Sequence, residues 1–491
     1  MALADNVAAA FDREVHVSHG DQRSRTWRWL ARPVTIFILL SVPFGLATIA
    51  INPPLRGNDE TAHFLRVYGI TSGDIVPSVR DDQNRRGVFI PAQLHADLSF
   101  FEAARQQVWT PGFDYRTVFI NYQHNHGSQS SKDADRQPVF ALYQGSEAYS
   151  PVPYLPSIVA GLVGRAFGAD FLTLFYLMRI AGLLAMTAAT AYAIAVVPHL
   201  QWTFLTIAML PSAFYGRTAI GADGATVSFT LVVTALCLRQ ACCPNDKAIW
   251  QRAVFMGLCV LSKPPQVAWL FLEAMCRPLR EIPRQWRTIA LVTLPGLILT
   301  GVWIAATTGD VGAWRVSSGL GMTAELFEPT RKISQLLADP LHFPALLLAS
   351  LGIWEFNQLW RQLIGVLGWL DTGLRDWLYP VLSALLMASV IVPLPLDRVV
   401  RYRVAAASIM AAVAYILGVY LIFYLTWTPI NATEIWGVQG RYFVVVLAPL
   451  AVAIAALVNR GLRERTQSAL AVGSAVLSIA ATIEAILRVN W

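Results

Sequence analysis

The sequence contains few charged residues. Only 14% of its 491 residues are Asp, Glu, Lys or Arg, whereas 55% are hydrophobic, and its mean hydropathy is +0.48. A soluble protein carries a charge at about a quarter of its positions. This shortage excludes a multidomain soluble protein and indicates a chain that crosses a membrane several times. The long apolar runs show no two-residue alternation, so we expect the spanning segments to be helices.

Cysteine is also scarce, and none of the five cysteines lies in the long, mostly polar segment 52–170. A disulfide framework in that segment is therefore excluded. The cysteines lie within or beside apolar runs, at spacings that are not typical of a metal site: Cys237, Cys242, Cys243, Cys259 and Cys276.

The familiar motifs of soluble enzymes are missing as well. The sequence has no P-loop, no dinucleotide fingerprint, no nucleophile-elbow serine and no His-Glu-x-x-His motif. It therefore contains no recognisable nucleotide-binding domain. We expect any donor substrate to reach the protein from within the membrane.

The net charge of +7 is distributed as a topology signal and does not predict nucleic-acid binding. Arginines gather in short segments between apolar runs, at 277–287, 398–403 and 460–465, and in the tail 1–32. Such positive clusters are typical of cytoplasmic segments. The N-terminus is therefore expected in the cytoplasm, and the segment that follows the first apolar run on the outer side.

These patterns predict an all-α polytopic membrane protein with about 11–13 transmembrane helices and a large first periplasmic loop. Its expected parts are a cytoplasmic tail (1–32), a first span (33–51), a periplasmic loop with surface helices (52–170), core spans (171–307), a periplasmic or re-entrant segment (308–376) and C-terminal spans (377–491). The later spans are expected near 171–197, 201–218, 223–240, 250–262, 266–276, 288–307, 377–394, 403–427, 441–459 and 466–488. This gives about eleven spans, with the C-terminus outside.

Two adjacent carboxylates, Asp59 and Glu60, follow the first span directly. Asn58 is a suitable N-cap for a helix in which Asp59, His63 and Arg66 share one face. A carboxylate beside a histidine or arginine can act as a general base or hold a divalent cation such as Mg²⁺ or Mn²⁺. The alternative is that the acidic pair only stabilises the helix N-terminus.

A second acidic residue, Asp223, lies between two apolar runs on the same outer side as Asp59. Again the alternative is a helix cap. Two acidic positions that face one aqueous cavity favour a functional interpretation over either position alone. We therefore take Asp59, Glu60 and Asp223 as candidate catalytic residues, and Asp59 with Asp223 as the candidate metal ligands.

Several cations near the ends of apolar runs are candidates for binding phosphate. Arginine offers a planar fork to phosphate oxygens and lysine a point charge. The alternative is that these side chains extend to lipid headgroups. Lys263, which lies between apolar runs beside two prolines, needs a partner in any case. The candidate substrate-binding residues are Arg56, His63, Arg66, Arg217, Lys263, Arg441 and Tyr442.

Tryptophan and tyrosine are frequent in the outer segments, for example at Trp354, Trp427 and Trp436. Most of them fit an aromatic belt at the membrane interface. Some of these rings can equally stack on sugars in an outer cleft.

Six stretches carry a resemblance to a known family. With these stretches the chain resembles a group of bacterial multispanning membrane proteins of unknown function, which are regarded as relatives of the GT-C glycosyltransferase superfamily. They run from the first loop to the last: Pro54 to Arg66 with its Asp-Glu-x-x-His core, Tyr149 to Gly168, Pro211 to Asp223, Ser262 to Pro265, Gly365 to Asp371 and Gly437 to Phe443.

The resemblance implies an inverting glycosyltransferase of the bacterial inner membrane. Enzymes of that superfamily move a sugar from a polyprenyl-phosphate carrier to an acceptor on the periplasmic side. An acidic residue of the first outer loop is typically essential, and a second lies in the next outer loop. Asp59 or Glu60 would take the first role and Asp223 the second. The acceptor would be an envelope glycan, lipid or protein.

Two other functions remain open from the sequence. A transporter or flippase for lipid-linked sugars would bind the same donor. A non-catalytic subunit of envelope-glycan assembly would tolerate the loss of its carboxylates.

Overall fold

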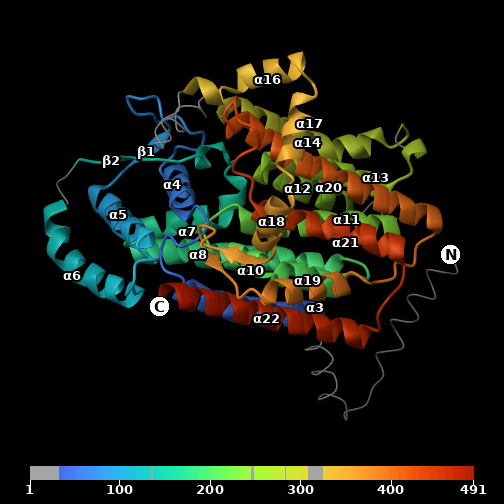
Figure 1. The fold of residues 1–491 in the computed structure, drawn as a ribbon, viewed down its shortest axis with the longest axis horizontal. Coiled ribbons are helices and arrows are strands. Elements are labelled where there is room, and N and C mark those ends of the chain that lie inside the picture. Colours follow the sequence, from blue (N-terminus) through green and yellow to red (C-terminus); the bar gives the residue numbers. More distant parts are fainter. Residues whose placement is uncertain (1–31, 134–136, 245–247, 282, 308–323) are drawn as a thin grey trace, which may run out of the picture.

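In a computed structural model the protein is a bundle of helices with most of the first loop folded at one end (Figure 1). The structure describes residues 32–133, 137–244, 248–281, 283–307 and 324–491. Most of the expected tail 1–32 and residues 308–323 of the expected segment 308–376 lie outside these ranges.

Among the described residues, seven helical segments are long and apolar enough to cross a membrane. All seven coincide with predicted spans, which confirms an all-α polytopic membrane protein. They are α3 (Pro33–Ile51), α8 (Phe171–Val196), α11 (Asp223–Cys242), α14 (Trp286–Thr307), α20 (Arg398–Thr426), the continuous pair η8 (Gly440–Val446) and α21 (Leu447–Val458), and α22 (Glu464–Asn490).

The other four predicted spans fall on shorter helices, so the total of about eleven stays a prediction. Proline accounts for two of the breaks, because it cannot continue a helical hydrogen-bond ladder and restricts the residue before it. Pro211 separates two helices, and Pro264 follows the end of another. The shorter elements are α9 (Gln201–Met209), α10 (Pro211–Gly216), α12 (Ile249–Ser262), η4 (Pro264–Leu272), α13 (Glu273–Cys276) and α19 (Leu378–Ser389).

The first loop folds around a hydrophobic core of its own. Phe64, Phe101 and Tyr115 are buried in it, and the core continues onto Phe171 and Phe175 of α8. A short antiparallel ladder pairs Gly87 with Leu142. The elements are α4 (Glu60–Thr71), β1 (Gly87–Ile90), α5 (Ala92–Gln106), α6 (Tyr115–Asp133), β2 (Val139–Leu142), η1 (Ser146–Ala148), η2 (Val152–Tyr154) and α7 (Leu155–Ala166).

Helix α7 covers most of the apolar stretch 151–168 but has only 12 residues. At about 1.5 Å per residue it is too short to cross a bilayer. It packs against α4 and α8 and exposes Val159, Val163 and other apolar side chains. This arrangement agrees with the expected surface helix of the first loop.

The described part of segment 308–376 contains only short helices and one small hairpin. None of its helices is long enough to be a span. The elements are η7 (Ala324–Phe327), α16 (Pro329–Ala338), α17 (His342–Ala349), α18 (Ile353–Gly365), β3 (Val366–Leu367) and β4 (Thr372–Gly373).

The C-terminus lies at the same end of the bundle as the first loop (Figure 1). The Trp491 indole Nε1 donates a hydrogen bond to the Ile51 carbonyl at 2.7 Å, and its ring stacks on Phe119 of α6. The last helix, α22, therefore ends beside the first loop. The expected placement of the C-terminus on the side of the first loop agrees with this geometry.

A buried ion pair fixes helix α4 to helix α8. The Glu60 carboxylate accepts hydrogen bonds from the Arg179 guanidinium at 2.7 and 2.8 Å and from the backbone N–H groups of Gly57 and Ile220. Both charged side chains are fully buried. Position 57 must be glycine, because a Cβ there would lie 2.6 Å from the Glu60 carboxyl carbon.

A second buried pair joins the start of the first loop to the late hairpin. Arg56 binds Asp371 through both terminal nitrogens, at 2.7 and 3.1 Å, and also donates to Thr372. The Trp369 indole donates to the Leu55 carbonyl at 3.2 Å. The loop that carries Asp59 is thus held by residues more than 300 positions away.

The Glu60–Arg179 pair yields a stability prediction. Replacing Glu60 with Gln leaves a buried, uncompensated Arg179, and breaking such a pair typically costs about 3–5 kcal/mol. We expect Glu60→Gln to melt well below the wild type in detergent. Asp59→Asn is the matched control, because the Asp59 side chain is 43% exposed and should melt close to the wild type. Equal melting of the two variants would contradict the structural role of Glu60.

Candidate functional site

Asp59 points into a polar cluster at the end of the bundle that carries the first loop. It occupies the N-cap position of α4, one residue after the expected Asn58, with a left-handed backbone (φ 51°). Its side chain makes no capping hydrogen bond. Instead it forms a short ion pair with Arg441. The alternative role as a helix cap therefore does not describe the Asp59 side chain.

Asp223 reaches the same cluster from the first turn of α11. Its Oδ1 lies 3.4 Å from Lys263 Nζ, and its Oδ2 lies 3.7 Å from Arg441 Nη1. It is the first residue of α11, whose N-cap position is Ala222. Arg441 consequently bridges the two acidic residues, and Lys263 neutralises the second.

Four elements that are distant in sequence meet here. They are the start of α4, the start of α11, the junction between α12 and η4, and η8. The partners Asp59 and Arg441 are separated by 382 positions. The structure thus brings together the two acidic residues and two of the cations that the sequence singled out. We call Asp59, Asp223, Lys263 and Arg441 the polar site.

Aromatic rings line one side of the polar site. Lys263 Nζ lies 4.2 Å from the ring centroid of Tyr442 and 5.8 Å from that of Tyr149. Tyr442 in turn stacks on Phe423 at 5.4 Å. Cations over aromatic faces are attracted by the ring quadrupole. The lysine, which needed a partner, therefore has a carboxylate and two rings.

His63 packs behind the polar site. Its Nδ1 is hydrogen-bonded to the Tyr154 hydroxyl at 2.6 Å, and its ring lies edge-on to Tyr149. Burial disfavours the charged imidazolium and lowers the pKa of His63 to about 4, although Asp59 and Asp223 act in the opposite direction. His63 is accordingly neutral at physiological pH and adds no charge to the site.

Four other predicted site residues bind within the protein and away from the polar site. Glu60 and Arg56 form the buried pairs already described. Arg66 donates to the carbonyls of Asp74 and Ile75, at 2.9 and 2.6 Å, and Arg217 donates to the Ala208 carbonyl at 2.8 Å. The geometry therefore favours Asp59 over Glu60, a choice that the sequence left open.

Several functional contacts were not predicted from the sequence. Arg179 is the partner of Glu60, and Asp371 that of Arg56. A lone arginine in the apolar run of α8 was a usable signal, because a charge at membrane depth requires a partner. Tyr149 and Tyr154 belong to a stretch that carries the family resemblance, but their contacts with Lys263 and His63 depend on the fold.

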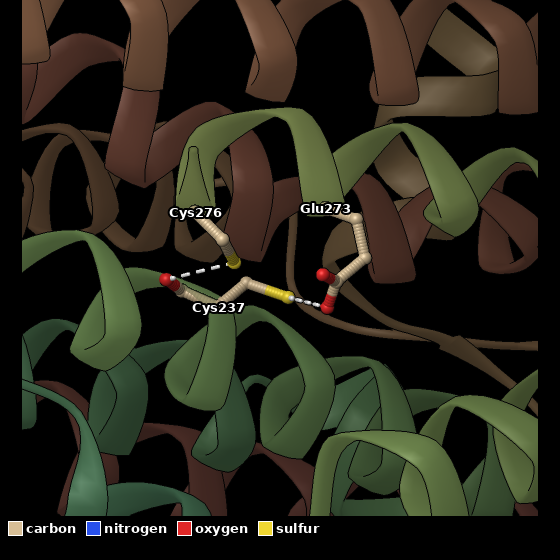
Figure 2. Close-up of side chains that lie close together, drawn as sticks. All are labelled: Cys237, Glu273 and Cys276. Atoms are coloured by element: carbon tan, nitrogen blue, oxygen red, sulfur yellow. Dashed lines mark hydrogen bonds between the residues drawn. The ribbon is translucent and has the colours of Figure 1, made fainter. Parts of the chain in front are cut away.

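The structure allows two places to be compared as metal sites. Between Asp59 and Asp223 the Arg441 guanidinium already occupies the position of a cation, so a metal ion would have to displace it. A different group, Cys237, Glu273 and Cys276, has its ligand atoms within 4.8 Å of one another (Figure 2). There Arg252 binds Glu273 at 2.9 Å and neutralises its charge without a metal.

The low pKa of His63 predicts a pH dependence of stability. Between the ordinary pKa of 6.5 and about 4, the unfolded chain binds a proton that the folded protein does not. The stabilisation is therefore present above pH 6.5 and is lost as the pH falls toward 4. From pH 7.5 to 5 this amounts to roughly 2 kcal/mol. Melting curves of wild type and His63→Gln across this range should show a steeper decline for the wild type. If the melting temperatures of the two proteins fell in parallel, the lowered pKa of His63 would be contradicted.

Comparison with known proteins identifies a family. Residues 43–453 match a family described as "Predicted membrane protein (DUF2142)". No curated protein and no solved structure matches the chain. The matched range includes every residue of the polar site and the buried pairs that position it. The expectation of a membrane-protein family of unknown function is confirmed: the chain belongs to the DUF2142 family of membrane proteins.

Proposed function

We propose that the protein is a glycosyltransferase that moves a sugar from a polyprenyl-phosphate donor to an acceptor at the outer surface of the bacterial inner membrane. One observation carries this proposal: two carboxylates share one arginine, beside a lysine and aromatic rings, at the outer end of a membrane-spanning bundle. A site for transfer from a lipid phosphate needs these groups, namely a base, a phosphate-binding cation pair and a surface for a sugar ring.

The donor phosphate is expected to bind Arg441 and Lys263. Arginine and lysine recognise phosphate oxygens through charge-assisted hydrogen bonds. Without a ligand, these two cations are neutralised by Asp59 and Asp223. An arriving phosphate competes with the carboxylates for the same N–H groups. Binding of the donor thereby frees Asp59 from Arg441 at the moment when a base is required.

In the proposed step Asp59 removes the proton of an acceptor hydroxyl. The acceptor oxygen forms a bond to the anomeric carbon of the donor sugar, and the bond from that carbon to the phosphate oxygen breaks. The electron pair leaves with the polyprenyl phosphate, whose additional negative charge Arg441 and Lys263 stabilise. The transfer is direct, so the anomeric configuration inverts.

Asp223 positions Lys263 and Arg441 in this scheme. Its carboxylate lies 3.4 Å from the lysine and 3.7 Å from the arginine and so holds both cations on one side of the site. The Arg441 guanidinium supplies the positive charge that a divalent cation would otherwise provide. A metal ion bound by Asp59 and Asp223 is the alternative version of the same site.

The resemblance to GT-C transferases supports the same reaction. Those enzymes place an acidic residue in the first outer loop and another in the next, as Asp59 and Asp223 are placed here. The large folded first loop and the absence of a recognisable nucleotide-binding motif also suit a donor that is delivered by the membrane.

Transfer is expected to depend on the Asp59 carboxylate. Purified protein in lipid would be given a panel of polyprenyl-phosphate sugars and an envelope extract as the source of acceptor. A general base contributes about 10²- to 10⁴-fold, so Asp59→Asn should lose at least about a hundredfold in rate. Asp376→Asn is the matched control, because Asp376 is an exposed carboxylate outside the polar site.

Two results would contradict the proposal in different ways. Full transfer by Asp59→Asn would remove the assigned base. Movement of the labelled lipid across vesicles without a new glycosidic bond would indicate a flippase that uses the same donor-binding residues.

A further inference from the structure

A groove of about 500 Å³ lies close in sequence to η8, the element that carries Arg441. One wall is α18, and the other is the segment 434–438 that precedes η8. Two tryptophans, two carboxylates and two amides contribute to its lining: Trp354, Trp436, Glu355, Glu434, Gln358 and Gln362.

The chemistry of this lining is that of a carbohydrate site. Indole rings offer flat apolar faces for sugar rings, while carboxylates and amides accept and donate hydrogen bonds to hydroxyl groups. Among the residues that the structure describes, no lysine or arginine lines the groove. Two carboxylates without a cation disfavour an anionic lipid headgroup and favour a neutral or basic sugar chain. The polar site, with Lys263 and Arg441, has the opposite preference.

The groove is fixed by hydrogen bonds to the backbone of its second wall. The Ile435 N–H donates to Ser350 Oγ at 2.8 Å, and the Trp436 N–H donates to Thr428 Oγ1 at 3.0 Å. Gly437 has a left-handed backbone (φ 81°), and a Cβ there would lie 2.3 Å from Trp427. Only glycine suits this position, and the backbone of the second wall therefore has one defined conformation.

The groove shares a wall with the segment that carries the partner of the proposed base. Gln362 in its lining accepts a hydrogen bond from the Gly440 N–H at 2.7 Å. The next residue, Arg441, pairs with Asp59. A sugar chain in the groove would therefore lie against the same backbone segment, 434–441, whose Arg441 pairs with the carboxylate that is assigned to deprotonate an acceptor.

We propose that this groove binds the acceptor, and that the acceptor is a neutral or basic glycan chain. The inference rests on the proposed transferase function for its direction. The binding of a glycan does not require transfer to occur. Donor and acceptor would thereby bind at places of opposite charge preference. The lipid phosphate would bind Lys263 and Arg441, and the sugar chain would lie along the carboxylates and indoles of the groove.

The test measures glycan binding apart from transfer. Wild-type protein in lipid nanodiscs would be titrated calorimetrically with neutral hexasaccharides of glucose, mannose and N-acetylglucosamine, and with anionic hexagalacturonate. We expect binding of at least one neutral chain and none of hexagalacturonate. Trp354→Ala, at a side chain that is 69% exposed, should weaken this binding roughly tenfold without unfolding the protein.

Two control variants separate the possible outcomes. Trp109→Ala removes an equally exposed indole of the first loop outside the groove and should bind like the wild type. Asp59→Asn should keep glycan binding while it loses transfer. If the wild type binds the glycan but transfers no sugar, the assignment of the groove stands and the proposed transferase function is refuted.

Two outcomes would overturn the groove assignment. The first is that no neutral hexasaccharide binds the wild type. The second is that Trp354→Ala binds glycan as well as the wild type and differs only in its partition into lipid, which would make Trp354 part of the interfacial aromatic belt.

Discussion

The contact between Arg441 and the two carboxylates Asp59 and Asp223 organises the end of the bundle that carries the first loop. It joins the first loop to the next-to-last long span, and Lys263 completes its charge balance. In a partly desolvated place, two positive and two negative side chains are stable together, whereas any one of them alone is not. Under the proposed function the same balance makes the site responsive, because an incoming phosphate would replace the carboxylates as the partner of the cations.

The two ion pairs that flank Asp59 in sequence explain why its side chain is held in position. Glu60 is fixed by Arg179, and Arg56 by Asp371. Adjacent acidic residues thus have different roles: Glu60 anchors the start of α4, and Asp59 pairs with Arg441 in the polar site. An exposed functional carboxylate is supported by a neighbour that is wholly buried and fully hydrogen-bonded.

Sequence reasoning predicted the membrane bundle, its seven long spans and the meeting of Asp59 with Asp223. Hydropathy predicts the spans, and the arginine distribution predicts which connecting segments lie on the same side of the membrane; both patterns can be recognised in short stretches of sequence. The partners of Glu60, Arg56 and Lys263 could not be predicted, because they depend on contacts between segments hundreds of residues apart. Four of the eleven predicted spans fall on shorter helices, two of the breaks lying at Pro211 and Pro264, and these four stay predictions.

The account depends most directly on Arg441 and Lys263 as the phosphate-binding pair. The decisive measurement is the affinity of sugar-free polyprenyl phosphate for the wild type, Arg441→Gln and Lys263→Gln in nanodiscs, by native mass spectrometry. Arg375→Gln is the control, because Arg375 is an exposed arginine outside the polar site. The account predicts that both site variants bind at least about tenfold more weakly, since each loses a charge-assisted contact. Equal affinity in all four proteins would contradict it.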